Sequence, residues 1–451
     1  MTKDKWRLLL RSILFLLVLV TAIGVVQKPF GVKAPYDHSR QVRYYDEKRG
    51  SLDGVYIGGS DVHAFWQPAF GWADKGVAVW NYSFSSFSPG LAKPILMEVR
   101  KTQPDALYII SLSTFKKNST KNAVEKNHRV VDYIPFSLNK FRIIRQMARD
   151  SGYGFDETLE LLFPIVRFHS RWDELTPWAF GVSVHDYKSS NLDDKFNGEV
   201  EPAIESIPVF DDRADVPEDV MSAMTSLLDY CDQNKLKVLF VKVPQVTTVE
   251  QQGRMNTLED LVRQRGYPCL DLMERMEDMG LDAHTDFYND KHTNVHGSVK
   301  VSQYLCDYLV ENYGFEDKRG RPEWKSWDAA SRNYIKHLGR YLLPFEGVRD
   351  SRTDLPIPRL ATPVVRGQEV DLAWEASEGA DGYEVFRLGE KGTWESVADL
   401  SGAARTYTDR GLEPGASYAF TVVPYREEGG GRRYGSFCIN GETARTEGET
   451  A

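Results

Sequence analysis

The sequence predicts an α/β protein with a doubly wound parallel sheet, followed by a separate antiparallel β-sandwich. Along most of the chain, short apolar runs such as Val55–Ile57 and Ala106–Leu112 alternate with amphipathic helical patterns, which is typical of βαβ units. After residue 357 the apolar period changes to two, as in half-buried antiparallel strands. A basic and then apolar N-terminus adds a third segment, which belongs to neither fold.

Length and charge exclude some classes of protein. The 451 residues are 41% apolar and 27% charged, which is ordinary for a globular chain of two or three domains. The net charge of −9 and the lack of a basic face argue against a nucleic-acid partner. The four cysteines lack the close spacing that metal sites and disulfide scaffolds use, so we expect no structural zinc site. The serine chemistry considered below needs no metal or organic cofactor.

The first 29 residues predict an export segment. Lys3, Lys5, Arg7 and Arg11 precede the apolar run Ile13–Val26, which places the N-terminus inside and the rest of the chain outside the membrane. We favour a retained single-pass anchor, because the run extended by its upstream apolar residues can cross a bilayer core of about 30 Å. The alternative is a signal peptide that is cleaved near Ala22-Ile23-Gly24.

A serine follows the first predicted strand. Val55–Ile57 suit a buried strand, Gly58 and Gly59 permit a tight turn, and Asp61 can cap a following helix. Ser60 therefore lies at the carboxyl edge of the sheet, where α/β proteins bind ligands and where backbone N–H groups stabilise negative charge. Ser60 is the candidate nucleophile. The alternative is a tight turn with a capping serine.

The next strands bring further polar groups to the same edge. The second strand, Gly76–Trp80, leads to Ser83, and the third, Ala106–Leu112, leads to Ser113. More than 100 residues separate the third strand from the next clear one, Leu236–Val243, which is too long for an ordinary connection and predicts an inserted helical cap. Three tryptophans are candidates for substrate contacts, with core packing as the alternative: Trp66, Trp172 and Trp178.

A titratable loop precedes a late amphipathic helix, Ser298–Val310. A serine hydroxyl needs an adjacent base that a carboxylate orients, and Asp290 and His292 provide both groups within three residues. His63 lies one helical turn from Ser60 and is expected to be structural.

The order of these motifs resembles the SGNH/GDSL hydrolase superfamily, including its cell-surface O-acyltransferase branches, over Ser51–Tyr313. The resemblance implies a flavodoxin-like sheet of the SGNH type, with the nucleophile in Gly58-Gly59-Ser60-Asp61 and the acid and base at Asp290 and His292. The Asp-Lys-His spacing is similar to that of exported polysaccharide O-acetyltransferases. The commoner Asp-x-x-His spacing would put Asn289 in the acid's place, and Asp286 is held in reserve.

The same resemblance implies an oxyanion hole. Its backbone donors would be the N–H groups of Ser60 and Ser83. Ser83 stands where the family has a glycine. Its side-chain donor is an asparagine after the third strand. Asn118 is the candidate, although it follows the strand somewhat late, and Ser111-Leu-Ser113-Thr114 stands in the family position. The donor is therefore Asn118, a substitute, or absent.

The C-terminal segment predicts a module of its own. Trp374, Tyr383 and the stretch Leu412–Tyr418 resemble a fibronectin type III domain, in which the last stretch forms a tyrosine corner. We therefore divide the chain into residues 1–29 (anchor), 30–344 (SGNH-like domain), 345–356 (linker) and 357–451 (fibronectin type III domain).

These observations lead to two functional hypotheses. The first is an extracytoplasmic, membrane-anchored serine esterase or O-acyltransferase acting on acyl groups, acetyl in particular, of a cell-envelope glycopolymer. The second is a non-catalytic SGNH-like envelope protein that binds glycan or a membrane-bound acyl-transfer partner. The replacement of the family's oxyanion-hole asparagine after the third strand favours the second hypothesis. Ser60, Asp290 and His292 favour the first.

Overall fold

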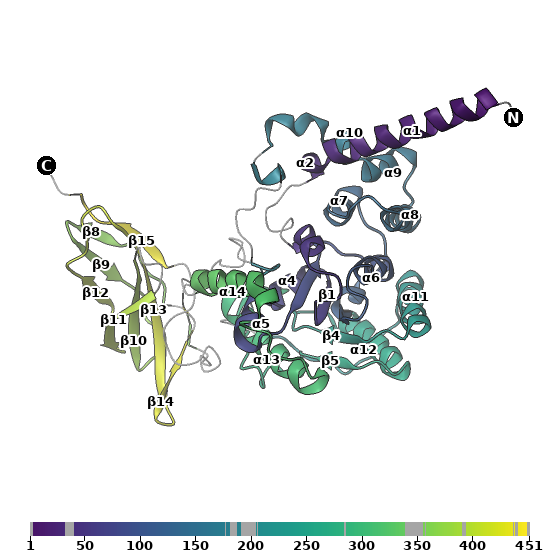
Figure 1. Cartoon of the computed structure of the whole chain (residues 1–451). Coiled ribbons are helices and arrows are strands. Elements are labelled where there is room, and N and C mark those ends of the chain that lie inside the picture. The colour runs from purple at the N-terminus through teal and green to yellow at the C-terminus, as the bar shows by residue number, and fades with distance from the viewer. Residues whose placement is uncertain are drawn as a thin grey trace.

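The protein consists of a long N-terminal helix, an α/β body and a β-sandwich (Figure 1). The computed structural model describes residues 3–31, 40–175, 177–180, 187–190, 204, 206–283, 286–338, 355–356, 358–389, 394–435, 437 and 441–448. Of the predicted linker 345–356 only its last two residues are described, and Cys438 lies outside the described residues.

The body is built on a five-stranded parallel sheet with the order β2-β1-β3-β4-β5. Its strands are fully buried, which explains why they read as continuous apolar runs in the sequence. They are β1 (Gly54–Gly58), β2 (Val79–Ser83), β3 (Leu107–Ser111), β4 (Val238–Lys242) and β5 (Cys269–Asp271). The predicted α/β class and doubly wound parallel sheet are confirmed, because the strand order reverses at β1.

Helices cover both faces of this sheet. On one face Val55 and Ile57 share a core with helices α6 (Ala92–Arg100), α11 (Glu218–Asn234) and α12 (Val249–Gln264). On the other face Tyr56 packs with α4 (Ser60–Phe65) and α13 (Val295–Tyr313). Two further helices, α5 (Pro68–Lys75) and α14 (Lys325–Leu338), pack against each other, and α5 also contacts α13.

The long connection between β3 and β4 is helical over much of its described part. It begins with the 3-10 turn η3 (Leu112–Lys116) and continues with α7 (Val124–Val131), α8 (Leu138–Ser151), α9 (Phe155–Leu162), α10 (Pro164–Phe168), η4 (His169–Asp173) and η5 (Pro177–Phe180). We call α7 to η5 the cap. Ser137 begins α8 as its N-cap, with its side chain accepting from the Lys140 N–H at 3.2 Å.

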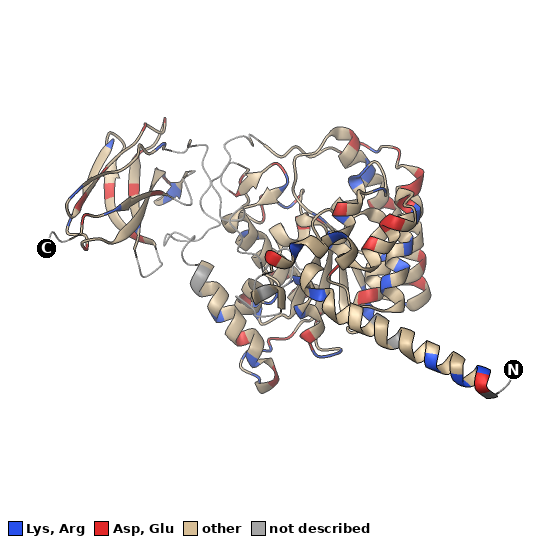
Figure 2. Cartoon of the chain, turned by 90° about the horizontal axis from the view of Figure 1, so that it is seen from above, with Lys and Arg blue, Asp and Glu red and all other residues tan. Residues whose placement is uncertain are grey.

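The N-terminal helix α1 (Lys3–Val26) projects from the cap side of the body. Its 24 residues span about 36 Å, and by length and composition it can cross a membrane. None of its most apolar window is buried, and its Lys and Arg residues lie towards the free end (Figure 2). A cleaved signal sequence has the same properties, so both predicted fates of this segment stay open.

The C-terminal part is an antiparallel β-sandwich, as predicted. One sheet has the order β12-β9-β8, and the other has the order β11-β10-β13-β14 with β15 also on β13. Their bounds are β8 (Val364–Arg366), β9 (Glu369–Ala373), β10 (Gly382–Leu388), β11 (Trp394–Ser401), β12 (Thr406–Asp409), β13 (Ser417–Glu428), β14 (Gly431–Tyr434) and β15 (Glu442–Arg445). Trp374 and Tyr383 meet in the core at 5.7 Å between ring centroids, and the Tyr418 hydroxyl accepts from the Glu413 N–H at 3.1 Å.

Candidate active site

Ser60 lies just beyond the carboxyl end of β1. Strand β1 ends at Gly58, and α4 begins at Ser60, so the serine is the first helical residue after a sharp turn. A Cβ atom at position 58 would lie 2.6 Å from a Val62 methyl and 2.7 Å from the Ser111 Cβ. Only glycine fits there without displacing β3 or α4. The missing side chain lets α4 begin close to the end of β1, with Ser60 as its first residue.

The histidine lies on a short hairpin rather than on an irregular loop. Strands β6 (Phe287–Asn289) and β7 (His292–Thr293) pair antiparallel, with Asn289 directly opposite His292. Asp290 and Lys291 form the tip. The hairpin is held against α4 because the Thr293 hydroxyl donates to the Ala64 carbonyl at 2.5 Å.

The fold brings the serine and the histidine into contact. His292 Nε2 lies 2.8 Å from Ser60 Oγ, although 232 residues separate the two in sequence. On the other side of the ring, His292 Nδ1 lies 2.9 Å from Asn289 Oδ1. Ser60, His292 and Asn289 thus form a continuous hydrogen-bonded chain, with the arrangement of a nucleophile, a base and an orienting group.

The hydrogen-bond network fixes the tautomer of His292. Asn289 Oδ1 also accepts from the Lys291 backbone N–H at 2.9 Å. Because a backbone N–H can only donate, the Asn289 atom at this position must be the oxygen, and His292 Nδ1 must carry a proton. Nε2 then has the free lone pair, and Ser60 donates to it. The network therefore prepares His292 to receive the serine proton.

Asn289, and not the predicted Asp290, occupies the orienting position. Residues directly opposite each other in an antiparallel pair present their side chains on the same face, which brings Asn289 to the imidazole. Asp290 lies at the tip, where its carboxylate is about half exposed and pairs with the Lys291 ammonium at 3.2 Å. The reserve candidate, Asp286, is fully buried and paired with Lys300 at 2.8 Å.

Burial lowers the pKa of His292 to about 4, although Asp61 and Asp290 oppose this shift. The imidazole is therefore neutral at pH 7. Asp61 is a buried carboxylate next to Ser60 in the chain, and it accepts a hydrogen bond from the Ser111 hydroxyl. Of the charged groups acting on His292, Asp61 has the largest effect, so it supplies a negative charge that the uncharged Asn289 cannot.

The predicted oxyanion residues have different surroundings. The amide of Ser60 belongs to the first turn of α4, where backbone N–H groups have no intrahelical acceptor. Ser83 ends β2 opposite Gly58, and its hydroxyl lies 3.2 Å from Nδ1 of the buried His63. The exposed Asn118 is committed elsewhere, because its side-chain oxygen accepts from Arg254 on α12.

Sequence reasoning did not consider Thr114 by itself as the third donor. Its hydroxyl is buried in η3, the turn that follows the strand beside β1, and it has no hydrogen-bond partner within the described part of the chain. Its neighbours are occupied: Ser111 donates to Asp61, and Ser113 accepts from the Val243 N–H at 3.0 Å. The sequence signal was the run of hydroxyl residues that replaces the expected asparagine.

The two candidate tryptophans whose side chains are described, Trp66 and Trp172, do not share a surface. Trp66 is fully buried, and its indole N–H donates to the Val79 carbonyl at 3.0 Å, so it belongs to the core rather than to a substrate groove. Trp172 lies on η4 in the cap with 72% of its surface exposed. The side chain of Trp178 lies outside what the structure describes.

Lysine side chains also approach the site. Lys116 in η3 donates to the Gln245 side chain, which in turn donates to the Lys291 carbonyl at 3.1 Å. Burial lowers the pKa of Lys116, while Asp61 and Asp290 oppose the shift and Lys291 adds to it. The link through Gln245 connects η3 to the tip of the histidine hairpin.

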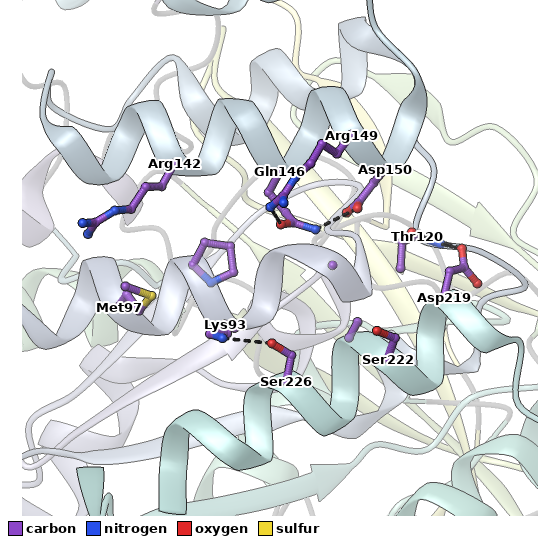
Figure 3. Close-up of a pocket in the computed structure, with 13 residues that line it drawn as sticks. Lys93, Met97, Thr120, Arg142, Gln146, Arg149, Asp150, Asp219, Ser222 and Ser226 are labelled. Atoms are coloured by element: carbon purple, nitrogen blue, oxygen red, sulfur yellow. Dashed lines mark hydrogen bonds between the residues drawn. The ribbon is translucent and has the colours of Figure 1, made fainter. Parts of the chain in front are cut away.

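A cavity of about 570 Å³ lies away from this site, between α6, α8 and α11 (Figure 3). Arg142 and Arg149 of α8 reach its rim, and Lys93 of α6 donates to the Ser226 hydroxyl at 2.9 Å. Neither Ser60 nor His292 lines it.

No protein-family model and no curated protein matches the chain. Among solved structures, a β-1,2-glucanase from Parabacteroides distasonis is 20% identical over 22% of this chain and 14% of its own, with a TM-score of 0.19. The chicken CNTN1 FN1–FN3 domains are 16% identical over 21% of this chain and 31% of theirs, with a TM-score of 0.18.

A fibronectin type III domain of human collagen XX is 20% identical over 21% of this chain and 96% of its own, with a TM-score of 0.17. The likeness to fibronectin type III domains is weak, and it concerns the C-terminal all-β part.

Proposed function

We propose that the protein is a membrane-anchored, extracytoplasmic serine esterase or O-acyltransferase of the SGNH type. The observation that supports this most is the 2.8 Å separation of Ser60 Oγ and His292 Nε2, which joins two distant residues in the order that serine acyl chemistry requires. The substrate class, acyl groups on a cell-envelope glycopolymer, rests on the family resemblance and on the N-terminal helix.

The geometry allows a two-step acyl transfer. Ser60 Oγ attacks the acyl carbonyl while His292 Nε2 takes the hydroxyl proton, and Asn289 holds the ring in the required tautomer. The oxyanion is placed against the backbone N–H groups of Ser60 and Ser83. His292 then gives its proton to the departing sugar oxygen, which leaves an ester on Ser60.

In the second step a water molecule or a sugar hydroxyl attacks that ester. His292 takes the proton of the incoming group and returns one to Ser60 Oγ, so that the enzyme is restored and the acyl group ends on water or on the acceptor sugar. Asp61 stabilises the imidazolium that exists between these proton transfers, because its buried carboxylate acts on the ring through a medium of low dielectric constant.

The direct test is covalent labelling of Ser60 by a fluorophosphonate. We expect the intact protein to gain the mass of one probe, with the adduct on Ser60 in a peptide digest. Ser60→Ala should abolish labelling, and His292→Ala should slow it by about a thousandfold or more. Ser113→Ala is the matched control, because this hydroxyl lies at the same sheet edge but accepts from Val243.

One observation favours the non-catalytic alternative: Asn118, the candidate side-chain donor of the oxyanion hole, is tied to Arg254. A binding protein of this fold would keep the contact between Ser60 and His292 but would lack nucleophilic reactivity. Full-length protein that stays unlabelled, and that leaves 4-nitrophenyl acetate unhydrolysed above the rate of Ser60→Ala, would exclude the enzyme and leave this alternative.

A further inference from the structure

Large exposed apolar side chains are concentrated in the cap. Eleven such side chains lie outside α1 in the described part of the chain, and seven of them, including every aromatic, fall between residues 136 and 180. They are Phe136, Leu138, Phe141, Phe155, Val166, Trp172 and Phe180. Singly exposed apolar residues are normal, but a set gathered on adjoining elements marks an interaction surface.

Helix α8 shows how this surface is built. Its inner face buries Ile143, Ile144 and Met147 in the core of the body. Its outer face presents Leu138, Phe141, Arg142 and Arg145, which are all exposed and follow each other at helical spacing. Two apolar side chains and, after them, two guanidinium groups thus share one exposed stripe.

The charges of this region differ from those of the whole chain. Residues 124–151, which include α7 and α8, contain six Lys and Arg against three Asp and Glu, and residues 152–180 contain two against five. The cap is therefore balanced as a whole, with its basic excess on α7 and α8, whereas the whole chain has a net charge of −9. Of the cations on these two helices, Lys140 donates to the Ile134 carbonyl and Arg149 donates to the Gln146 side chain. Arg129, Arg142 and Arg145 are exposed and make no hydrogen bond or ion pair with the described residues. They are available to an anionic partner.

The chain itself brings this surface to a membrane. Helix α1 is followed after a single residue by α2 (Lys28–Gly31), which packs on α10, η4 and η5 of the cap. The Phe30 carbonyl accepts from Arg171 of η4 at 3.2 Å. A Cβ atom on Gly31 would lie 3.3 Å from the Asp132 Cβ at the end of α7, so α2 also touches the first helix of the cap.

A ring contact extends this connection to the exposed stripe. Phe136, just before α8, stacks on Phe163 at the start of α10, with 6.5 Å between the ring centroids. The exposed apolar side chains near the start of α8 therefore adjoin α10, one of the elements against which α2 packs. Both views show α1 and the C-terminal sandwich at opposite ends of the body (Figures 1 and 2).

We propose that the cap is a second membrane contact, which lies on the outer leaflet of the bilayer that α1 crosses and binds its anionic phospholipid headgroups. The inference depends on α1 being retained, but not on the chemistry at Ser60. The aromatic and aliphatic side chains enter the interface, and Arg129, Arg142 and Arg145 pair with phosphate groups. The unpaired arginines favour a lipid surface over an apolar protein partner, because anionic headgroups offer a phosphate to each arginine wherever it meets the membrane surface.

The experiment places a nitroxide spin label on single cysteines of the full chain in lipid nanodiscs. The label goes on Leu138→Cys or Trp172→Cys, both in the cap, and on Val364→Cys of the sandwich as the control. Cys438 is replaced by serine, and the three remaining cysteines are buried. Intact mass of each sample confirms that α1 is present, so that its loss is not mistaken for a failed contact.

In discs that contain anionic lipid, both cap labels should become several-fold more accessible to oxygen than to a water-soluble nickel chelate, relative to Val364→Cys. Arg142→Glu and Arg145→Glu should reduce this ratio, whereas Arg359→Glu, an exposed arginine of the sandwich, should leave it unchanged. Cap labels as aqueous as the control in anionic discs would overturn the proposal, and would leave a protein as the partner of the cap.

An equal ratio in zwitterionic and anionic discs, with no effect of Arg142→Glu, would also overturn the headgroup contact. Fluorophosphonate labelling of the same samples tests Ser60 separately, because the cap substitutions lie on other elements than β1, α4 and the histidine hairpin.

Discussion

At the level of single residues, the candidate site has an amide where a carboxylate was expected. The imidazole is oriented by Asn289 Oδ1, which is itself oriented by the Lys291 N–H. An amide oxygen can fix a tautomer as well as a carboxylate can, but it carries no net charge to stabilise the imidazolium. Of the charged groups that act on the ring, Asp61, one residue after Ser60, favours the imidazolium most.

This arrangement predicts a large loss of activity at Asn289 and a small one at its neighbour Asp290. Asn289→Ala removes the acceptor of the Nδ1 proton, so we expect kcat/KM to fall by about 10²- to 10⁴-fold. Asp290→Asn changes a half-exposed group at the hairpin tip and should lower it less than about threefold. Hydrolysis of 4-nitrophenyl acetate measures both. A large loss for Asp290→Asn together with an active Asn289→Ala would restore Asp290 as the orienting residue.

The pKa of His292 predicts the pH dependence. A base with a pKa of about 4 stays neutral from weakly acidic to alkaline pH, so kcat/KM should be constant around neutrality and should fall only as the pH drops towards 4. Asn289→Asp places a carboxylate on the ring, which favours the imidazolium, so the acid limb should move to higher pH. A wild-type limb near the ordinary value of 6.5 would contradict the effect of burial.

At the level of elements, a buried ion pair fixes the hairpin to the helix that follows it. The Asp286 carboxylate, just before β6, accepts from Lys300 Nζ on α13 at 2.8 Å and from the Asp282 N–H at 2.7 Å. Both charged side chains are fully buried. Gly297 permits the close approach, since a Cβ atom there would lie 2.2 Å from the Asp286 carbonyl oxygen.

Breaking this pair should be costly. Lys300→Met leaves the Asp286 carboxylate buried without its partner, so we expect the free energy of unfolding to fall by about 3–5 kcal/mol. Burial raises the pKa of Asp286 and Lys300 opposes the rise, so in the variant the pKa rises further. The loss should therefore be smaller at acid pH, where Asp286 is protonated and neutral.

Urea denaturation at two pH values measures this effect. The control is Asp307→Asn, which lies on α13 like Lys300 and breaks a partly exposed pair with Lys75 of α5. It should cost less than about 1 kcal/mol. Equal losses for the two variants would mean that the buried pair stabilises no more than a surface pair.

The sequence predicted the strands better than the site, and the reasons are physical. A strand buried on both faces must be apolar, so β1, β3 and β4 were found within a few residues of their observed bounds. The second strand was placed too early. Gly76 has a φ of 70° and ends α5, so the following residues lead into β2 instead of belonging to it.

The hairpin could not be recognised in the same way. Phe287-Tyr-Asn-Asp-Lys-His-Thr293 is short and contains no glycine, so neither period nor turn residues mark it as two strands. Without this pairing, Asp290 and Asn289 lie two and three residues from His292 along the chain, and the charge of Asp290 and its Asp-Lys-His spacing favoured Asp290. The burial of Trp66 could not be predicted either, because it depends on how the chain folds back: its indole N–H donates to the Val79 carbonyl at the start of β2.

At the level of the whole molecule, the sandwich is joined to the body through a shared apolar cluster. Val295 and Val299 of α13 and Tyr334 of α14 belong to the same cluster as Phe386 and Val423 of the sandwich. The ring of His296 also meets Phe437 edge to face, with 5.1 Å between centroids. This contact lies on the first turn of α13, immediately after the histidine hairpin.

The shared cluster predicts that the sandwich supports the body. Phe386→Ser removes a fully buried ring from the interface while the inner core around Trp374 and Tyr383 stays intact. We expect the unfolding temperature of the body to fall by several degrees, because truncating a buried phenylalanine lowers the free energy of unfolding by about 3–5 kcal/mol. Differential scanning calorimetry should show this shift, and Val364→Ser, at an exposed position on β8, should show none.

A body that unfolds at the wild-type temperature in Phe386→Ser would mean that the two parts are independent. The sandwich by itself, from residue 355 to the end, should still unfold cooperatively, since it has its own core, although it exposes Phe386 and Val423.

The position of the histidine hairpin along the chain has a consequence during synthesis. Ser60 directly follows β1, the first strand of the parallel sheet to leave the ribosome, whereas His292 comes after β5, the last strand of that sheet in the chain. The contact between Asn289 and His292 spans three residues and forms locally, but the contact between His292 and Ser60 requires the completed sheet. In the proposed enzyme, a chain that is still emerging or being exported would therefore carry an inert alcohol at position 60, and Ser60 would become reactive only when the histidine hairpin docks.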